Sequence, residues 1–399
     1  MRVRNTAKDA VLGMKRFSLF PPDTRNFLGE WLLHQAAARE NLLTPRYAFG
    51  EIFLNGERLG LYALEEDFDQ TMIEFRRRRD GPIVKFEAPE TPDEAEGDHG
   101  GEPAASQSGF YAAPVVAVHT ADSPLHPGRQ EALAASLRLL DSFRTGKYAP
   151  GRVFDLAPLA RFLALADLFG CGEHVLAWPN LRFYYDPLTS LLEPVMLSET
   201  AGSAVSRLAS FTDEFSGASR EARDFPSLVF EDPGLYAAYL RELERLSAPA
   251  YLERLLSDLS PRLEEFRPWF YRDYPAYDFD PARLRHNQGW IQGTLHPEKG
   301  LQAYLTTGPG APGLRLELAN AHRIPLEVKQ VLREGKPLLS LPAPLLLPPM
   351  PFSSPLVYRV VELPGAAGTL PDPQTAKSLT VGYRPVGLAM AVLMPTTSP

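Results

Sequence analysis

The sequence contains a single cysteine, Cys171, among 399 residues. One thiol excludes an intramolecular disulfide and a zinc site built only from cysteines, but it leaves the redox compartment open. No stretch approaches the roughly 18 uninterrupted apolar residues that span a bilayer, and the first ten residues, MRVRNTAKDA, lack the apolar segment of a secretory signal. The sequence therefore predicts no membrane-spanning segment and identifies no compartment.

Basic residues are fewer than acidic ones. The chain has 41 Lys and Arg against 49 Asp and Glu, a formal net charge of -8. Nucleic-acid binding driven by phosphate neutralisation requires an excess of basic residues, so that class of function is disfavoured. The sequence also lacks HExxH, P-loop and G-x-S-x-G motifs, which leaves zinc proteolysis, ordinary NTPase chemistry and α/β-hydrolase chemistry without support.

Composition divides the chain into four segments. The hydrophobic content of 44% supports real cores, and the length allows two or three domains. Residues 1–86 read as a compact α+β unit, and residues 129–285 are mainly helical around two central strands. Residues 87–128 contain no Lys or Arg and are rich in acid, Pro and Gly, which predicts a flexible acidic insertion. Residues 286–399 show the short alternating runs of a β-sandwich-like module.

Several boundaries have local signals. Asn55-Gly56 between two alternating apolar runs predicts a β-hairpin with a two-residue turn. Asp23 or Thr24 is expected to cap the first helix and Asp155 a later one, and a further helix is expected to start at Asp232-Pro233. The proline-rich stretch 341–351 reads as an extended connector between sheets.

The order of signals over residues 14–86 resembles the spore-coat protein H (CotH) kinase-like family. An Arg-containing helix start is followed by a hairpin, a Gly-x-Tyr motif, an acidic residue and a short strand with Lys. The matching residues in this chain are Arg25, Asn55-Gly56, Gly60-Leu61-Tyr62, Glu66 and Lys85. The resemblance resumes later and extends over most of the chain. It implies a kinase-like N-terminal lobe in residues 1–86, with its start possibly truncated, and a helical C-lobe in residues 129–285.

The resemblance also assigns a nucleotide site. Lys85, on the short strand PIVKF, matches the family lysine, and Glu66 is expected to hold it over ATP. Residues of these types suit phosphoryl transfer, which depends on positioning and on charge neutralisation. The alternative is a surface lysine at a strand end beside an exposed glutamate.

The central signature, ALADLFGCGEHVLAWPNLRFYYDPLTSLLEPVMLSETAG, matches the family in one position and departs from it in two. Asn180 matches the family Asn and is assigned to Mg²⁺. Glu173 and His174 stand where the family has its catalytic Asp, and Glu199 is the candidate where it has a metal-binding Asp. The extra methylene of Glu displaces a carboxylate by over an ångström, and a misplacement of that size costs about a hundredfold in rate. His174 is either a base or a hydrogen-bonded structural residue.

We therefore expect an α+β, atypical protein-kinase-like core followed by a β-rich C-terminal module. The resemblance implies an ATP- and Mg²⁺-dependent kinase acting on Ser or Thr of a protein. Loss of both family Asp positions favours the alternative, a degenerate relative or pseudokinase that binds or assembles spore-coat or cell-envelope proteins. Both readings involve a protein partner and no nucleic acid. The location stays unknown, and an extracytoplasmic one is compatible with a truncated start.

Overall fold

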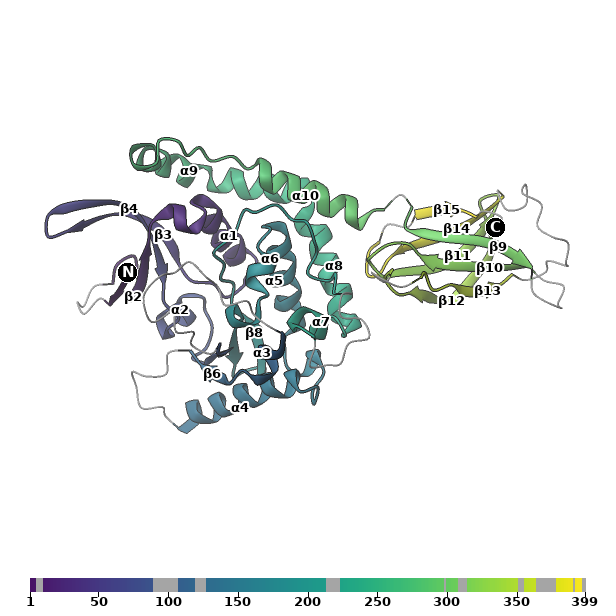
Figure 1. The fold of residues 1–399 in the computed structure, drawn as a ribbon, viewed down its shortest axis with the longest axis horizontal. Coiled ribbons are helices and arrows are strands. Elements are labelled where there is room, and N and C mark those ends of the chain that lie inside the picture. The colour runs from purple at the N-terminus through teal and green to yellow at the C-terminus, as the bar shows by residue number, and fades with distance from the viewer. Residues whose placement is uncertain are drawn as a thin grey trace. The chain divides into compact units, whose positions relative to one another are not determined.

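The computed structural model describes residues 1–4, 10–88, 107–118, 127–212, 223–297, 299–307, 314–350, 355–363, 378–389 and 392–396. Over these residues the fold is α+β, as expected, with ten α-helices and four antiparallel sheets (Figure 1). The chain forms two compact units. The first comprises residues 1–209 and 217–290, and the second comprises residues 210–216 and 291–399.

The first unit begins with a four-stranded sheet in the order β1-β2-β4-β3, with β1 Arg2–Arg4, β2 Arg16–Phe20, β3 Tyr47–Leu54 and β4 Glu57–Glu66. The predicted hairpin is confirmed. β3 and β4 are joined by Asn55 and Gly56, whose φ angles are 52° and 86°. Two consecutive residues with positive φ make the turn type that matches strand twist, and Gly and Asn tolerate that conformation best.

The first helix, α1 (Leu28–Arg39), starts later than the sequence suggested. Asp23 and Thr24 lie in a preceding 3-10 turn, η1 (Pro22–Arg25), so neither of them caps α1. Asn26 and Phe27 follow with φ angles of 50° and 53°, and this left-handed step turns the chain into the helix. α1 then packs under α9 (Pro249–Asp273), where Trp31 meets Phe266 edge to face at 5.2 Å.

A second sheet has the order β6-β5-β7-β8, with β5 Ile83–Phe86, β6 Val115–Ala117, β7 Arg182–Asp186 and β8 Leu191–Pro194. β6 and α3 (Gln107–Ala112) fall within the segment expected to be a flexible insertion. Phe110 of α3 is fully buried against Phe86, with ring centroids 4.8 Å apart. Residues 107–118 are therefore folded into the first unit through α3 and β6, and the expected insertion is corrected to that extent. Its residues 89–106 and 119–126 lie outside the described chain.

Helices pack around this second sheet. The predicted cap at Asp155 is confirmed, because its side chain accepts a hydrogen bond from Ala157 N. The predicted helix start at Asp232-Pro233 is also confirmed, and Asp232 caps that helix by accepting from Gly234 N and Leu235 N. The remaining helical elements of the unit are α2 Gln70–Phe75, α4 Pro127–Arg144, η3 Pro150–Arg152, α5 Leu156–Leu168, α6 Gly172–Val175, η4 Trp178–Asn180, α7 Phe225–Val229, α8 Pro233–Ser247 and α10 Ala282–Leu295. α10 continues into the second unit by sequence, so the boundary expected at residue 286 falls inside a helix.

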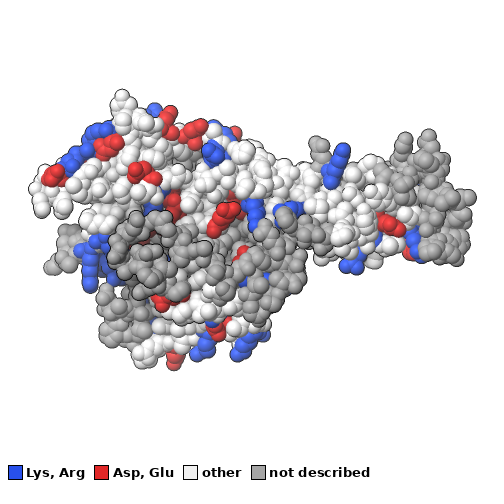
Figure 2. Space-filling view, in the orientation of Figure 1, with Lys and Arg blue, Asp and Glu red and all other residues white. Residues whose placement is uncertain are grey.

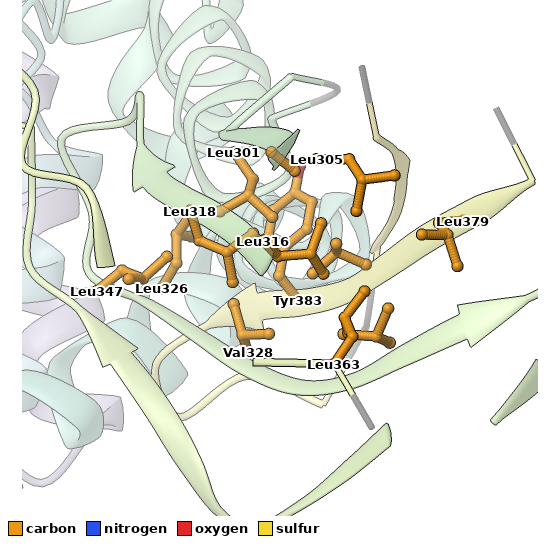
Figure 3. Packing of buried hydrophobic residues seen from close by; sticks show 13 residues of the cluster. Leu301, Leu305, Leu316, Leu318, Leu326, Val328, Leu347, Leu363, Leu379 and Tyr383 are labelled. Atoms are coloured by element: carbon orange, nitrogen blue, oxygen red, sulfur yellow. The ribbon is translucent and has the colours of Figure 1, made fainter. Parts of the chain in front are cut away.

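The second unit consists of two sheets in the orders β13-β10-β9 and β12-β11-β14-β15. Their buried faces share one apolar cluster, in which Leu316 and Leu318 of β10 lie near Val328 of β11 and Tyr383 of β14 (Figure 3). The strands are β9 Leu301–Thr307, β10 Leu314–Asn320, β11 Leu326–Arg333, β12 Lys336–Leu347, β13 Arg359–Glu362, β14 Leu379–Pro385 and β15 Val392–Pro395.

The proline-rich stretch expected to be a connector is mostly strand β12. β12 lies at the edge of its sheet and pairs with β11 alone. An edge strand tolerates proline because one row of its backbone groups needs no partner.

Both signs of charge are interspersed over the face of the molecule shown in Figure 2. Within the described ranges, no helix combines the length and the apolar character needed to cross a membrane.

The packing of α3 yields a stability prediction. Phe110→Ala should lower the free energy of unfolding by about 3–5 kcal/mol, because it removes a fully buried ring and leaves a cavity beside Phe86. Phe110→Leu, which keeps most of the volume, should cost clearly less. Chemical denaturation measures both. An unchanged midpoint for Phe110→Ala would show that residues 107–112 do not contribute to the core.

Candidate functional site

Two residues from distant parts of the sequence, Arg25 and His174, meet at the carboxylate of Glu199. Arg25 Nη1 forms an ion pair with Glu199 Oε1, and His174 Nε2 lies 3.9 Å from Glu199 Oε2. The side chains of Arg25 and His174 are 9% and 12% exposed, whereas that of Glu199 is 49% exposed. Glu199 is thus the solvent-facing member of the cluster, held from behind by a buried cation. We call Arg25, His174 and Glu199 the Glu199 cluster.

Local backbone features fix this cluster. Asn26, next to Arg25, donates its side-chain N–H to Ala201 O, which ties the start of α1 to the loop that carries Glu199. Gly29 makes the close approach possible, because a Cβ atom there would lie 2.4 Å from Ala201 O. The guanidinium of Arg25 also lies over the ring of Phe20, 4.0 Å from its centroid.

Asn180 is attached to the same cluster through His174. Its Nδ2 donates to the backbone carbonyl of His174 at 2.9 Å, across the turn formed by α6 and η4. With the amide nitrogen committed in this way, its Oδ1 accepts no hydrogen bond from any described residue. An amide oxygen held in one orientation and without a donor is a suitable ligand for a hard cation.

Two buried carboxyl groups lie behind the cluster. Glu30 of α1 is fully buried, and burial together with the neighbouring Glu65 raises its pKa from 4.5 to about 8, against the opposing effects of Ser198 and Arg25. Burial likewise raises the pKa of Glu65 to about 7, with Arg25 lowering it and Glu199 raising it. Both side-chain oxygens of Glu30 and Oε2 of Glu65 are buried.

Two polar aromatic residues, Tyr47 and His34, are also buried in this region. The Tyr47 hydroxyl is buried, and its pKa is raised by burial and by Glu30. His34 stacks on Tyr47 with ring centroids 5.0 Å apart, its Nδ1 is 2.6 Å from Thr44 Oγ1, and burial lowers its pKa to about 3. His34 is therefore neutral, and Arg25 is the cation that faces the three glutamates.

The structure brings together His174, Asn180 and Glu199, and it separates the other predicted residues from them. Glu173 is exposed on α6 and has no ion pair or hydrogen bond with the described residues. The expected Lys85–Glu66 ion pair does not form. Glu66 is buried and accepts from Arg46 N at 3.1 Å and from Arg46 Nε at 2.9 Å.

Lys85 lies on β5 and pairs instead with Glu87, 3.7 Å away. The physical reason for both corrections is strand geometry. Arg46 immediately precedes β3, and its carbonyl accepts a hydrogen bond from Glu66 N at the end of β4, whereas Lys85 belongs to a different sheet.

No protein-family model matches the chain, and no curated protein matches it.

The oxygen ligands of the site suit Mg²⁺ bound together with phosphate. Within the described residues, no three His, Cys, Asp or Glu side chains are grouped so that they could hold a metal. Mg²⁺ at a phosphoryl-transfer site commonly takes only one or two protein ligands and completes its shell with phosphate oxygens and water. The exposed carboxylate of Glu199 and the unengaged Oδ1 of Asn180 fit that requirement.

Sequence reasoning missed the buried half of this site. Glu30 and His34 are four residues apart and both fully buried on α1, a spacing that places two polar groups on one helical face. That spacing is the sequence signal from which a polar face of the first helix could have been predicted. Glu65 and Glu66 are adjacent on β4 and point to opposite faces of the sheet, and the sequence does not indicate that Glu66 pairs with Arg46 while Glu65 lies toward Glu30 and Arg25.

Titration of Glu30 should make stability depend on pH. Its folded pKa of about 8 exceeds the ordinary 4.5, so the folded protein retains a proton that the unfolded chain releases. This contribution to stability is complete below about pH 4.5 and is lost as the pH rises through about 8. Glu30→Gln, which is neutral throughout, should therefore raise the Tm relative to the parent at pH 8.5 and leave it nearly unchanged at pH 5.

Glu173→Gln is the matched control, because it removes an exposed carboxylate from the same unit. It should leave the pH profile of the Tm unchanged. Parallel profiles for Glu30→Gln and the parent would contradict a protonated Glu30.

Proposed function

We propose that the first unit is a CotH-like atypical kinase core that binds ATP with Mg²⁺ and transfers a phosphoryl group to Ser or Thr of a protein. The observation that carries the proposal is the common anchorage of Asn180 and Glu199. Asn180 is bonded to the backbone of His174, and Glu199 faces the His174 ring. The result is two oxygen ligands held around one fixed residue at the surface of the unit.

Each residue of the cluster has a chemical role in this proposal. Glu199 and Asn180 would hold Mg²⁺, which when bound neutralises charge on the phosphate oxygens. Arg25 would hold the Glu199 carboxylate in a fixed orientation through their ion pair. His174, placed beside that carboxylate, is the group able to accept the proton of the attacking hydroxyl. The side chain of Glu173 is exposed, and no described residue orients it in the same way.

One observation favours the second candidate, a catalytically degenerate protein that binds or assembles coat or envelope proteins. The Arg25 guanidinium already neutralises Glu199, so a divalent cation would have to share that carboxylate with an arginine. A protein that kept the kinase-like core only as a scaffold would retain this internal ion pair and bind no nucleotide.

Nucleotide titration separates the two candidates. The parent should gain thermal stability from ATP with Mg²⁺, and a ligand at a hundredfold excess over its Kd stabilises by about 2.7 kcal/mol. Asn180→Ala and Glu199→Gln should weaken the Mg²⁺-dependent part of ATP binding at least about tenfold, because each removes an oxygen ligand. Glu199→Asp, which keeps the charge but shortens the side chain, should change it less.

Glu173→Gln again serves as the control and should bind as the parent does. Circular dichroism of each variant establishes that it is folded. A parent that shows neither an ATP-dependent thermal shift nor label transfer from [γ-³²P]ATP to itself or to a generic protein acceptor would rule out the kinase and leave the scaffold.

A further inference from the structure

The three-stranded sheet of the second unit has one face in the core and one face turned away from it. Its strand order is β13-β10-β9. Leu316 and Leu318 of the central strand β10 lie in the apolar cluster that fills the core (Figure 3). Because successive strand residues point to opposite faces, Arg315 and Glu317 lie on the other side. We call that side the outer face of the sheet.

Two tyrosines and a valine give the outer face an apolar and aromatic surface. Glu317 is directly opposed by Tyr304 of β9 and by Val360 of β13, so these residues share the outer face. Tyr358, two residues before Val360, lies beside Tyr304, with ring centroids 5.9 Å apart and ring planes inclined by 44°. Tyr358 is 39% exposed and Val360 is 55% exposed. Solvent therefore reaches aromatic and aliphatic surface at the edge of this sheet.

Polar side chains of the same face are held in fixed orientations. The Tyr358 hydroxyl donates a hydrogen bond to Gln302 Oε1 at 2.6 Å, which orients both the tyrosine ring and the amide group. The Thr306 hydroxyl donates to Glu317 Oε1 at 3.3 Å. Gln302, Thr306 and Glu317 are all half-buried, so each one is partly accessible to a ligand.

The outer face carries little uncompensated charge. Arg315 Nε lies 2.7 Å from Glu362 Oε1 of the neighbouring strand, and this ion pair cancels the charge of both groups. The remaining acidic group is Glu317, which accepts the hydrogen bond from Thr306. A strongly charged polymer would meet no field of opposite sign here, so charge complementarity favours a neutral ligand.

We propose that the outer face binds a neutral glycan built of linked pyranose rings. The C–H face of a pyranose is apolar and packs on aromatic rings such as those of Tyr304 and Tyr358. The hydroxyls at its rim both donate and accept hydrogen bonds, as the amide of Gln302 and the carboxylate of Glu317 require. From Gln302 to Thr306 the face extends about 13 Å, at about 3.3 Å per residue, which is longer than one sugar ring.

A protein partner fits this face less well. A stable protein interface buries about 800 Å² on each partner, around an apolar centre that is poor in charged residues. Here Glu317 stands between Tyr304 and Val360, and the Arg315–Glu362 ion pair occupies the next row of the sheet. The charged groups are therefore at the centre of the face. The proposal concerns the second unit and does not depend on the proposed kinase.

The test measures glycan binding by the full chain. Cellohexaose, N-acetylated chitohexaose and maltohexaose are titrated by calorimetry, with glucose as the probe for a single ring. At least one hexasaccharide should bind, and it should bind more tightly than glucose, because several linked rings contact the face together. The panel also identifies the ring type and linkage that the face prefers.

Variants of the two tyrosines test the surface itself. Tyr358→Ala and Tyr304→Ala each remove one ring and should weaken hexasaccharide binding at least about fivefold. Tyr358→Phe keeps the ring and loses only the hydrogen bond to Gln302, so it should bind more tightly than Tyr358→Ala. Tyr271→Ala is the matched control, because it removes a tyrosine that is 73% exposed on α9 of the first unit. It should bind as the parent does.

The proposal is overturned if none of the three hexasaccharides binds. It is also overturned if Tyr358→Ala and Tyr304→Ala, shown to be folded by circular dichroism, bind as the parent does. Sedimentation adds a third outcome. A parent that self-associates and binds no glycan, together with a monomeric Tyr358→Ala, would assign the face to contact between copies of the chain and reject the glycan. None of these measurements contains ATP or magnesium, so failure of the kinase proposal leaves them unaffected.

Discussion

The first unit depends on a single buried cation set among carboxyl groups. Arg25 is 8% exposed, pairs with Glu199 and lowers the pKa of both Glu30 and Glu65. Without it, the carboxyl groups of α1, β4 and the loop after β8 would repel one another with no cation among them. At the effective dielectric constant of protein interiors, a pair of unit charges 4 Å apart interacts by about 4 kcal/mol, so the arrangement of all three segments is coupled to this one side chain.

One cation does not neutralise three carboxylates, and protonation of the buried carboxyl groups removes the remaining negative charge. Glu30 and Glu65 have pKa values of about 8 and 7. Because these values are close to pH 7, a small change in the surroundings of either group alters its charge. Their oxygens are buried, whereas Glu199 faces solvent. A cation that bound at Glu199 would weaken its repulsion of Glu65 and favour ionisation there. Proton release and ligand binding at this site are therefore linked.

Local signals in the sequence predicted local structure well. The Asn55-Gly56 turn, the cap at Asp155 and the helix start at Asp232-Pro233 involve residues within four positions of each other, so the backbone geometry follows from the residues themselves. The predicted Lys85–Glu66 ion pair is wrong because the two residues belong to different sheets. Nothing in the sequence indicated that Arg46 would be the strand neighbour of Glu66, or that Arg182 would oppose Lys85. Those contacts are set by strand register, which the folded chain alone determines.

The same limit applies to the site. The order of motifs was enough to single out His174, Asn180 and Glu199, whereas Arg25 appeared only as a helix landmark. What these residues share is visible only in space. The Glu199 cluster joins residues from η1, α6 and the loop after β8, and Asn180 is tied to it through the carbonyl of His174. Because Arg25 already pairs with one carboxylate oxygen of Glu199, a cation bound there would depend on the second oxygen together with Asn180 Oδ1. The proposed metal site therefore requires both side chains, and neither one would hold the ion alone.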